Sequence, residues 1–316
     1  MTSLARPTRR TVSPVTYRRI TFAALLAQAF IIVTGAAVRL TGSGLGCSDW
    51  PTCEEESLVA PLEYHALIEF GNRLVTFLVL ATVVAAIWGA RRRDPFRPDL
   101  LRWSLGLLAG VVAQVLLGGI TVLTHLWPPV VMGHFLLSMV LVWNAVVLHH
   151  RAGHDGSAGV DVVSAPTRAG INAIAVLGAI VVFSGTVVTG TGPHGGDETV
   201  ERLPLDLPQV ARAHAVLVWI LLALIVTVLV RLAREGAPRP LWRAGQWLLV
   251  AVVVQGAIGY VQYANGVPVE LVALHIVGSI LVWGTIVKMA LETRRRPGVG
   301  GDPSPRHGDD TALVGT

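Results

Sequence analysis

The chain has 316 residues, of which 53% are hydrophobic and only 14% are charged. Soluble domains carry about 25% charged residues, so this composition excludes an ordinary soluble globular protein. The formal net charge is +5, but the basic residues are scattered over several loops without a compact patch interleaved with aromatics. This distribution argues against nucleic acid as a partner.

Eight apolar blocks follow one another along the chain, each close to the ~20 residues that a bilayer-spanning helix needs. They lie near residues 20–40, 64–90, 101–125, 130–150, 168–190, 209–232, 243–264 and 268–292. The blocks lack the alternation of barrel strands, so we expect an all-α membrane protein with eight transmembrane helices. The first block is too long for the apolar region of a signal peptide and has no cleavage site after it, so we expect no cleavable signal.

Charge alternates between the connections of these blocks. Arginines gather in segments 9–19, 91–97, 231–243 and 294–296, whereas segments 54–63 and 197–206 are acidic. Cytoplasmic loops carry the excess of basic residues, so both termini are predicted to be cytoplasmic. We expect a multi-pass protein of the cell (plasma) membrane, surrounded by lipid, with its active-site ends on the extracytoplasmic side.

The sequence repeats once. Gln114 precedes His134 by twenty positions, and Gln255 precedes His275 by the same spacing. A weaker match relates Thr34-Gly35 to Ser184-Gly185. An even number of helices in each half gives both halves the same orientation, as in a parallel repeat. We therefore predict two pseudo-twofold-related four-helix bundles.

This repeat predicts five segments. They are a cytoplasmic N-terminal tail (1–19), an N-terminal four-helix bundle (20–150), a cytoplasmic linker (151–167), a C-terminal four-helix bundle (168–292) and a disordered cytoplasmic tail (293–316).

Three histidines are the candidate metal ligands. His134, His214 and His275 fall near the predicted outer ends of three apolar helices, where an ionisable side chain is costly and marks a functional site. His214 and His275 lie in the same half and can clamp one heme iron. The first half departs from this pattern, because the position that corresponds to His214 is Asn72. A second ligand opposite His134 is then absent, a water, or a residue such as His65 or His125.

Other polar residues surround these positions. Glu69 sits early in a membrane helix and is either an ion-pair partner of Arg73 at i+4 or a general base beside the first-half site. Arg39, Arg73 and Arg212 lie on the outer side and are expected to pair with heme propionates, or with lipid phosphate and the acidic loops. Cys47 and Cys53 share the first outer loop, where an oxidising compartment favours a disulfide. Either a structural or a redox role fits them.

Taken together, these motifs resemble those of the heme A synthase family, in an actinobacterial-like variant. The resemblance covers nearly the whole chain apart from its tails. The motifs that carry it are Gly35-x-x-Val38-Arg39-x-Thr41-Gly42-Ser43-Gly44-Leu45-x-Cys47, Asp49-Trp50-Pro51-x-x-Cys53, Ile68-Glu69-Phe70 with Arg73, Gly133-His134, Arg212-Ala213-His214 and Leu274-His275.

The resemblance implies an oxidoreductase acting on a CH group, which converts heme O to heme A for cytochrome oxidase. The ring methyl becomes an alcohol and then a gem-diol that loses water to leave a formyl group. Heme b is implied to bind His214 and His275, with Arg212 nearby. The substrate heme is implied to meet His134, Asn72, Arg39 and Arg73, with Glu69 at the reacting side. A disulfide between Cys47 and Cys53 is implied near the substrate.

Two alternatives remain open at the level of sequence. One is a non-catalytic di-heme cytochrome b for electron transfer, and the other is a heme carrier. Asn72 stands where the family usually has histidine, which breaks the symmetry that a di-heme cytochrome would keep. We therefore favour the enzyme, with contacts to heme O synthase and to cytochrome oxidase assembly as expected partners.

Overall fold

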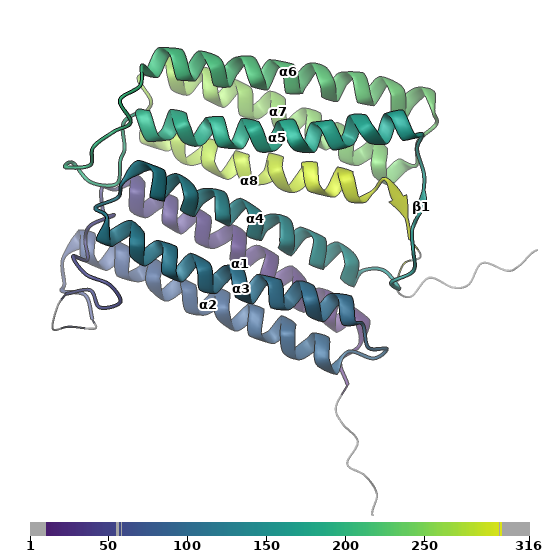
Figure 1. Ribbon diagram of the computed structural model, residues 1–316, viewed down its shortest axis with the longest axis horizontal. Helices are drawn as coiled ribbons and strands as arrows, with labels where there is room; N and C mark the ends of the chain where they lie inside the picture. The colour runs from purple at the N-terminus through teal and green to yellow at the C-terminus, as the bar shows by residue number, and fades with distance from the viewer. Residues whose placement is uncertain (1–10, 55–56, 58, 297, 299–316) are drawn as a thin grey trace, which may run out of the picture.

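Eight long helices dominate the structure, a computed structural model that describes residues 11–54, 57, 59–296 and 298 (Figure 1). All eight are long and apolar enough to cross a membrane, which confirms the predicted all-α, multi-pass membrane fold. The helices are α1 (Pro14–Leu40), α2 (Tyr64–Arg92), α3 (Pro98–Leu123), α4 (Pro128–Ala152), α5 (Ala165–Thr191), α6 (Leu207–Arg234), α7 (Arg239–Ala264) and α8 (Val269–Leu291).

The first helix begins earlier than its apolar block suggests. It starts at Pro14 and not near residue 20, so the helix extends into the segment expected as a tail (1–19). Ser13 caps this helix because its side chain accepts a hydrogen bond of 3.2 Å from the Thr16 N–H, and proline suits the first helical position. Hydropathy misses this start because the first turns carry Arg18 and Arg19.

Two short strands were not expected. Strand β1 (Val160–Asp161) lies in the predicted linker and pairs antiparallel with β2 (Arg294–Arg295), just after α8. The Asp161 carboxylate accepts hydrogen bonds from Arg294 at 2.9 Å and from Arg168. These bonds lower the pKa of Asp161. Of the predicted disordered tail 293–316, only 293–296 and 298 lie within the described residues.

The helices form two groups that lie side by side (Figure 1). Helices α1–α4 pack around a core that includes Val83, Leu107 and Leu148, and α5–α8 pack around one that includes Ile225 and Leu248. Between the groups, α4 and α8 are in contact. The two four-helix bundles therefore have separate cores and share a seam.

A small apolar cluster fills that seam. Met139 and Val142 of α4 pack there with Ile32 of α1 and Ile280 of α8. The Trp283 indole crosses the seam and donates a 2.8 Å hydrogen bond to the Met139 carbonyl.

Matching turns place two of the predicted histidines. The α3–α4 turn has two consecutive left-handed residues, His125 and Leu126, and the α7–α8 turn has Gly266 and Val267. The second residue of each pair donates a backbone hydrogen bond back into the preceding helix, to the Thr121 carbonyl in one turn and to the Gln262 carbonyl in the other. These shared turns account for the equal spacing of the two sequence motifs. The pseudo-twofold relation of the halves and the orientation in the membrane stay predictions.

Candidate functional site

One cavity of about 1470 Å³ runs through both bundles and is lined by residues of all eight helices. Its walls are mostly apolar, and the α1–α2 and α5–α6 loops contribute Trp50 and Arg202. Small-molecule pockets usually measure about 300–1,000 Å³, so this cavity exceeds the size needed for one such ligand. His134, His214, His275, Asn72 and Glu69 all line it, so the fold brings the principal predicted residues to one space.

Each of the three histidine rings packs against a glycine of the preceding helix. A Cβ on Gly118 would lie 3.3 Å from Cε1 of His134, one on Gly185 3.3 Å from Cε1 of His214, and one on Gly259 3.1 Å from Cε1 of His275. Contacts this short leave little room for a larger residue. The glycines thus leave room for the Cε1–Nδ1 edge of each ring against the neighbouring helix.

Glutamines hold the helices that carry two of these rings. The Gln114 side chain donates to the His134 carbonyl at 3.0 Å, and the Gln255 side chain donates to the His275 carbonyl at 2.6 Å. The repeated glutamine–histidine spacing in the sequence therefore corresponds to a hydrogen bond between adjacent helices.

His214 differs from the other two in the partner of its ring. The Ser184 hydroxyl lies 2.8 Å from Nδ1 of His214. A hydrogen bond at one ring nitrogen fixes the ring and the tautomer, leaving the other nitrogen for a ligand. By contrast, Nδ1 of His134 and Nδ1 of His275 are buried with no hydrogen-bond partner among the described residues.

Asn72 in the first bundle and His214 in the second have similar hydroxyl partners. The Thr34 hydroxyl donates to Oδ1 of Asn72 at 2.7 Å, as Ser184 contacts His214. A Cβ on Gly35 would lie 4.0 Å from the same oxygen. The two side chains thus have similar neighbours, an amide in the first bundle and an imidazole in the second, and their correspondence stays a prediction.

The polar atoms of the cavity fit an iron porphyrin. Within the described part of the chain, no residue hydrogen bonds to Nε2 of His134, His214 or His275. Each ring therefore keeps its Nε2 for a ligand in the cavity, which all three residues line. Residues 11–54, 57, 59–296 and 298 contain no cluster of three or more His, Cys, Asp or Glu side chains suited to a bare metal ion. Paired imidazoles suit heme iron instead.

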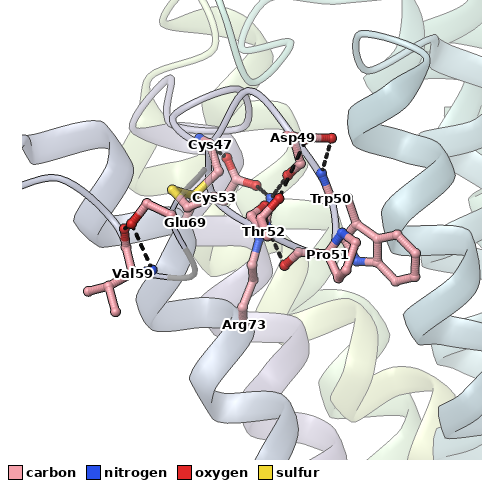
Figure 2. Close-up of a disulfide and its surroundings, with 10 residues drawn as sticks. Cys47, Asp49, Trp50, Pro51, Thr52, Cys53, Val59, Glu69 and Arg73 are labelled. Atoms are coloured by element: carbon pink, nitrogen blue, oxygen red, sulfur yellow. Dashed lines mark hydrogen bonds and ion pairs between the residues drawn. A yellow bond between two sulfur atoms is a disulfide. The ribbon is translucent and has the colours of Figure 1, made fainter. Parts of the chain in front are cut away.

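The Glu69 carboxylate is buried, with 5% of the residue exposed, and both of its oxygens are engaged. Oε1 pairs with the Arg73 guanidinium at 2.6 Å, and Oε2 accepts the backbone N–H of Cys47 at 2.8 Å (Figure 2). The expected i+4 ion pair is therefore present. A carboxylate has about four acceptor positions, so Glu69 retains capacity for a further hydrogen bond from the cavity.

Arg73 ties the same loop to α2. Besides Glu69, its guanidinium donates to the carbonyls of Thr52 at 2.8 Å and of Asp49 at 3.0 Å (Figure 2). The loop is closed by a disulfide between Cys47 and Cys53, whose Cα atoms are 4.5 Å apart. The predicted disulfide is confirmed, and Arg73 serves the loop in addition to lining the cavity.

Trp50, at the tip of this loop, was quoted in the sequence only as part of a motif. Its ring atoms lie 2.5–2.9 Å from where a Cβ on Gly119 would stand, so the indole is pressed against the bare backbone of α3. Trp50 also lines the cavity. Sequence reasoning gave no signal for this contact beyond the glycine pair Gly118-Gly119.

The remaining predicted residues take different positions. Arg39 lines the cavity and donates to the Thr189 carbonyl of α5 at 3.1 Å. Arg212 lines it but is exposed and bonds to the Pro208 carbonyl of its own helix at 3.1 Å. Nδ1 of His65 lies 2.9 Å from the Ser43 hydroxyl. Neither His65 nor His125 is among the residues that line the cavity.

The fold and the site define a class of protein. It is a polytopic membrane protein with a histidine-lined cavity that runs through two four-helix bundles. Comparison with known families is specific: the profile of the COX15-CtaA family, described as cytochrome oxidase assembly protein, matches residues 18–287. The chain therefore belongs to that family.

Individual relatives agree with this assignment. The chain is 31% identical over 185 residues to the heme A synthase of Symbiobacterium thermophilum, an alignment that covers 55% of this chain and 60% of that protein. It is 33% identical over 97 residues to the heme A synthase of Geobacillus kaustophilus, covering 30% of each chain. A protein of Thermus thermophilus named protoheme IX farnesyltransferase is 37% identical over 101 residues, which is 31% of this chain and 16% of that protein. The alignments thus span less than two thirds of each of these relatives.

Proposed function

We propose that this chain is a heme A synthase, which oxidises a ring methyl of heme O to a formyl group. The observation that carries the proposal is the asymmetry of one shared cavity. The second bundle presents His214 and His275, whereas the first presents His134 together with Asn72 and the buried carboxylate of Glu69. Two equal electron-transfer sites would not need that difference.

The second bundle is the proposed site of a resident heme b. His214 and His275 would hold its iron, with Arg212 near its propionates, and when bound the group supplies one-electron transfer. Ser184 orients the His214 ring, and Gly185 and Gly259 keep both rings in place. These residues bind and position; they do not meet the reacting methyl.

The first bundle is the proposed substrate site. His134 would ligate the heme O iron, and Asn72 leaves the opposite position without a strong ligand. The reaction requires two successive hydroxylations at one carbon, each of which adds one oxygen atom and needs an external oxidant that takes up two electrons, and loss of water from the gem-diol then leaves the formyl group. Glu69 is the proposed general base, because it lines the cavity with acceptor capacity to spare for a hydroxyl of the oxidised carbon. Arg39 and Arg73 are proposed to lie near the substrate heme.

We further propose that the protein lies in the plasma membrane with this site toward the extracytoplasmic side. The disulfide loop and the acidic segment 197–206 are at the end of the helices where the cavity's polar residues gather, and disulfides persist in oxidising compartments. Heme O arises by farnesyl transfer to protoheme, so the enzyme that makes it and the assembly of cytochrome oxidase are the proposed partners. The family description and the partial similarity to a protoheme IX farnesyltransferase support this placement.

The test is to co-express the chain with an enzyme that makes heme O and to separate the extracted hemes by chromatography. We expect heme A and an alcohol intermediate that are absent from cells lacking the chain. Heme O that persists unchanged, with heme b still bound to the purified protein, would instead support the electron-transfer cytochrome.

A further inference from the structure

Two guanidinium groups from different halves of the chain meet at one backbone carbonyl. Arg39, at the end of α1, donates to the Thr189 carbonyl at 3.1 Å, and Arg202, in the α5–α6 loop, donates to the same oxygen at 2.5 Å. Both arginines line the cavity. The junction of the two bundles therefore places two positive charges against one wall of an otherwise apolar space.

A glycine pair allows this close approach. A Cβ on Gly195 would lie 2.6 Å from Nη1 of Arg202, and one on Gly196 would lie 3.8 Å from Cγ of Arg39. Gly196 also has φ +110°, a conformation that favours glycine. Its carbonyl accepts the backbone N–H of Gly44 at 2.7 Å, which joins the outer loops of the two halves beside the arginines.

Among the residues that the structure describes, no acidic side chain balances the charges of this pair. Arg39 donates to the carbonyls of Thr189 and Pro193, and Arg202 donates to those of Thr189 and Gly192, all of which are neutral. No ion pair of either arginine occurs in the part of the chain that the structure describes. Burial lowers the pKa of Arg202, and two neighbouring cations in an apolar setting disfavour each other unless an anion lies between them.

The other cavity arginines differ in this respect. Arg73 has the Glu69 carboxylate as its partner. Arg212 is exposed and bonds within its own helix. Arg39 and Arg202 are thus the two cavity arginines whose positive charge has no acidic partner among the described residues.

We propose that Arg39 and Arg202 form a single carboxylate-binding site at the junction of the two bundles, which takes one carboxylate of a porphyrin bound in the cavity. The inference rests on the proposed function, because it takes the ligand to be a porphyrin diacid. Guanidinium forks bind carboxylates through paired, charge-assisted hydrogen bonds. Because Arg39 lies at the end of α1 and Arg202 in the α5–α6 loop, the ligand would hold the two halves of the chain together.

The test is a binding titration of the full-length chain, purified in detergent from a heme-deficient host, with iron protoporphyrin IX and with its dimethyl ester. Absorbance of the bound porphyrin gives the affinity and the number of sites. The variants are Arg39→Gln, Arg202→Gln and the double variant. Arg234→Gln, an exposed arginine in the last turn of α6, is the matched control.

We expect the wild type to bind the diacid about ten- to a hundredfold more tightly than the ester at the affected site, as charged hydrogen bonds commonly give. Each single variant should lose that preference while its ester affinity stays unchanged. Because the two side chains share one carboxylate, the loss of diacid affinity in the double variant should be much smaller than the product of the losses in the two single variants. The control should match the wild type, and unchanged melting temperatures exclude misfolding.

Four results would overturn the inference. If the variants bind the diacid and the ester equally more weakly than the wild type does, the arginines have a purely structural role. If the losses of diacid affinity in the two single variants multiply in the double variant, the arginines bind separate carboxylates. If neither porphyrin binds the wild type, the proposed function itself fails. If both porphyrins bind equally in every variant, only the carboxylate site fails.

Discussion

The backbone N–H of Cys47 donates a 2.8 Å hydrogen bond to Oε2 of Glu69, so the buried carboxylate of the cavity also anchors the disulfide loop (Figure 2). Glu69 thus has a positional role that is independent of any chemistry. The two roles predict different responses to substitution, because glutamine keeps an acceptor oxygen for Cys47 and loses the charge.

Glu69→Gln should abolish conversion of heme O by at least a hundredfold while the loop stays in place, since general bases typically contribute 10²–10⁴-fold. Glu69→Ala should be equally inactive and should also expose the Cys47–Cys53 disulfide to reduction. Heme chromatography measures the first effect, and thiol labelling after mild reductant measures the second. If Glu69→Gln retains activity, Glu69 holds the disulfide loop and is not the general base.

Gly119→Ala should displace Trp50. The new methyl would overlap the indole, whose nearest ring atom lies 2.5 Å from the Cβ position, and overpacking of this kind costs about 1–3 kcal/mol. We expect a lower melting temperature and faster reduction of the disulfide. Gly71→Ala is the control, because nothing lies within 4 Å of its Cβ position. Equal behaviour of the two variants would show that Trp50 does not depend on Gly119.

Ser184→Ala should weaken binding of heme b. The hydroxyl is the partner of Nδ1 of His214, and loss of such an outer contact commonly costs 10–100-fold in affinity. Titration of the purified protein with heme measures the effect. Thr285→Ala, which removes an exposed hydroxyl bonded to its own helix, should leave the affinity unchanged. If Ser184→Ala binds as tightly as the wild type, the serine does not orient the ring.

Asn72→His should create a second bis-histidine site. Thr34 and Gly35 surround Asn72 much as Ser184 and Gly185 surround His214, so an imidazole at position 72 has a matching hydroxyl and a neighbouring glycine. The reduced protein should then show twice the low-spin heme signal of the wild type. The same protein with His134→Ala added should return to the wild-type signal. A spectrum unaffected by Asn72→His would mean that the first bundle does not place residue 72 opposite His134.

Hydropathy was sufficient to predict the eight helices, because a membrane span must satisfy its own backbone and be apolar over its length. It failed at the start of α1, where a serine cap and a proline extend the helix through polar residues. The cavity histidines were predictable because ionisable groups stand out in apolar segments and because two of them repeat. The glutamine of each repeat proved to be the donor to the helix that carries its histidine.

The contacts that the loops make could not be predicted from the sequence. Arg202 lies in an irregular segment without periodicity, and only the path of the loop brings it to Thr189 beside Arg39. The i+4 spacing indicated the bond between Glu69 and Arg73, but the bonds from Arg73 to Asp49 and Thr52 depend on the fold of the disulfide loop. Spacing in the sequence predicts which side chains are neighbours on one helix. It does not predict which helix a loop contacts.

The central claim is that the second bundle binds heme b and the first bundle binds and converts heme O. Heme analysis of three purified proteins tests this claim most directly. Wild type, His134→Ala and His214→Ala would be expressed with a heme O source, and the hemes would be extracted from protein and cells. We predict heme b in the wild type and in His134→Ala, heme A formation only in the wild type, and loss of bound heme b in His214→Ala. Heme A formed by His134→Ala, or heme b lost from it and kept by His214→Ala, would contradict the account.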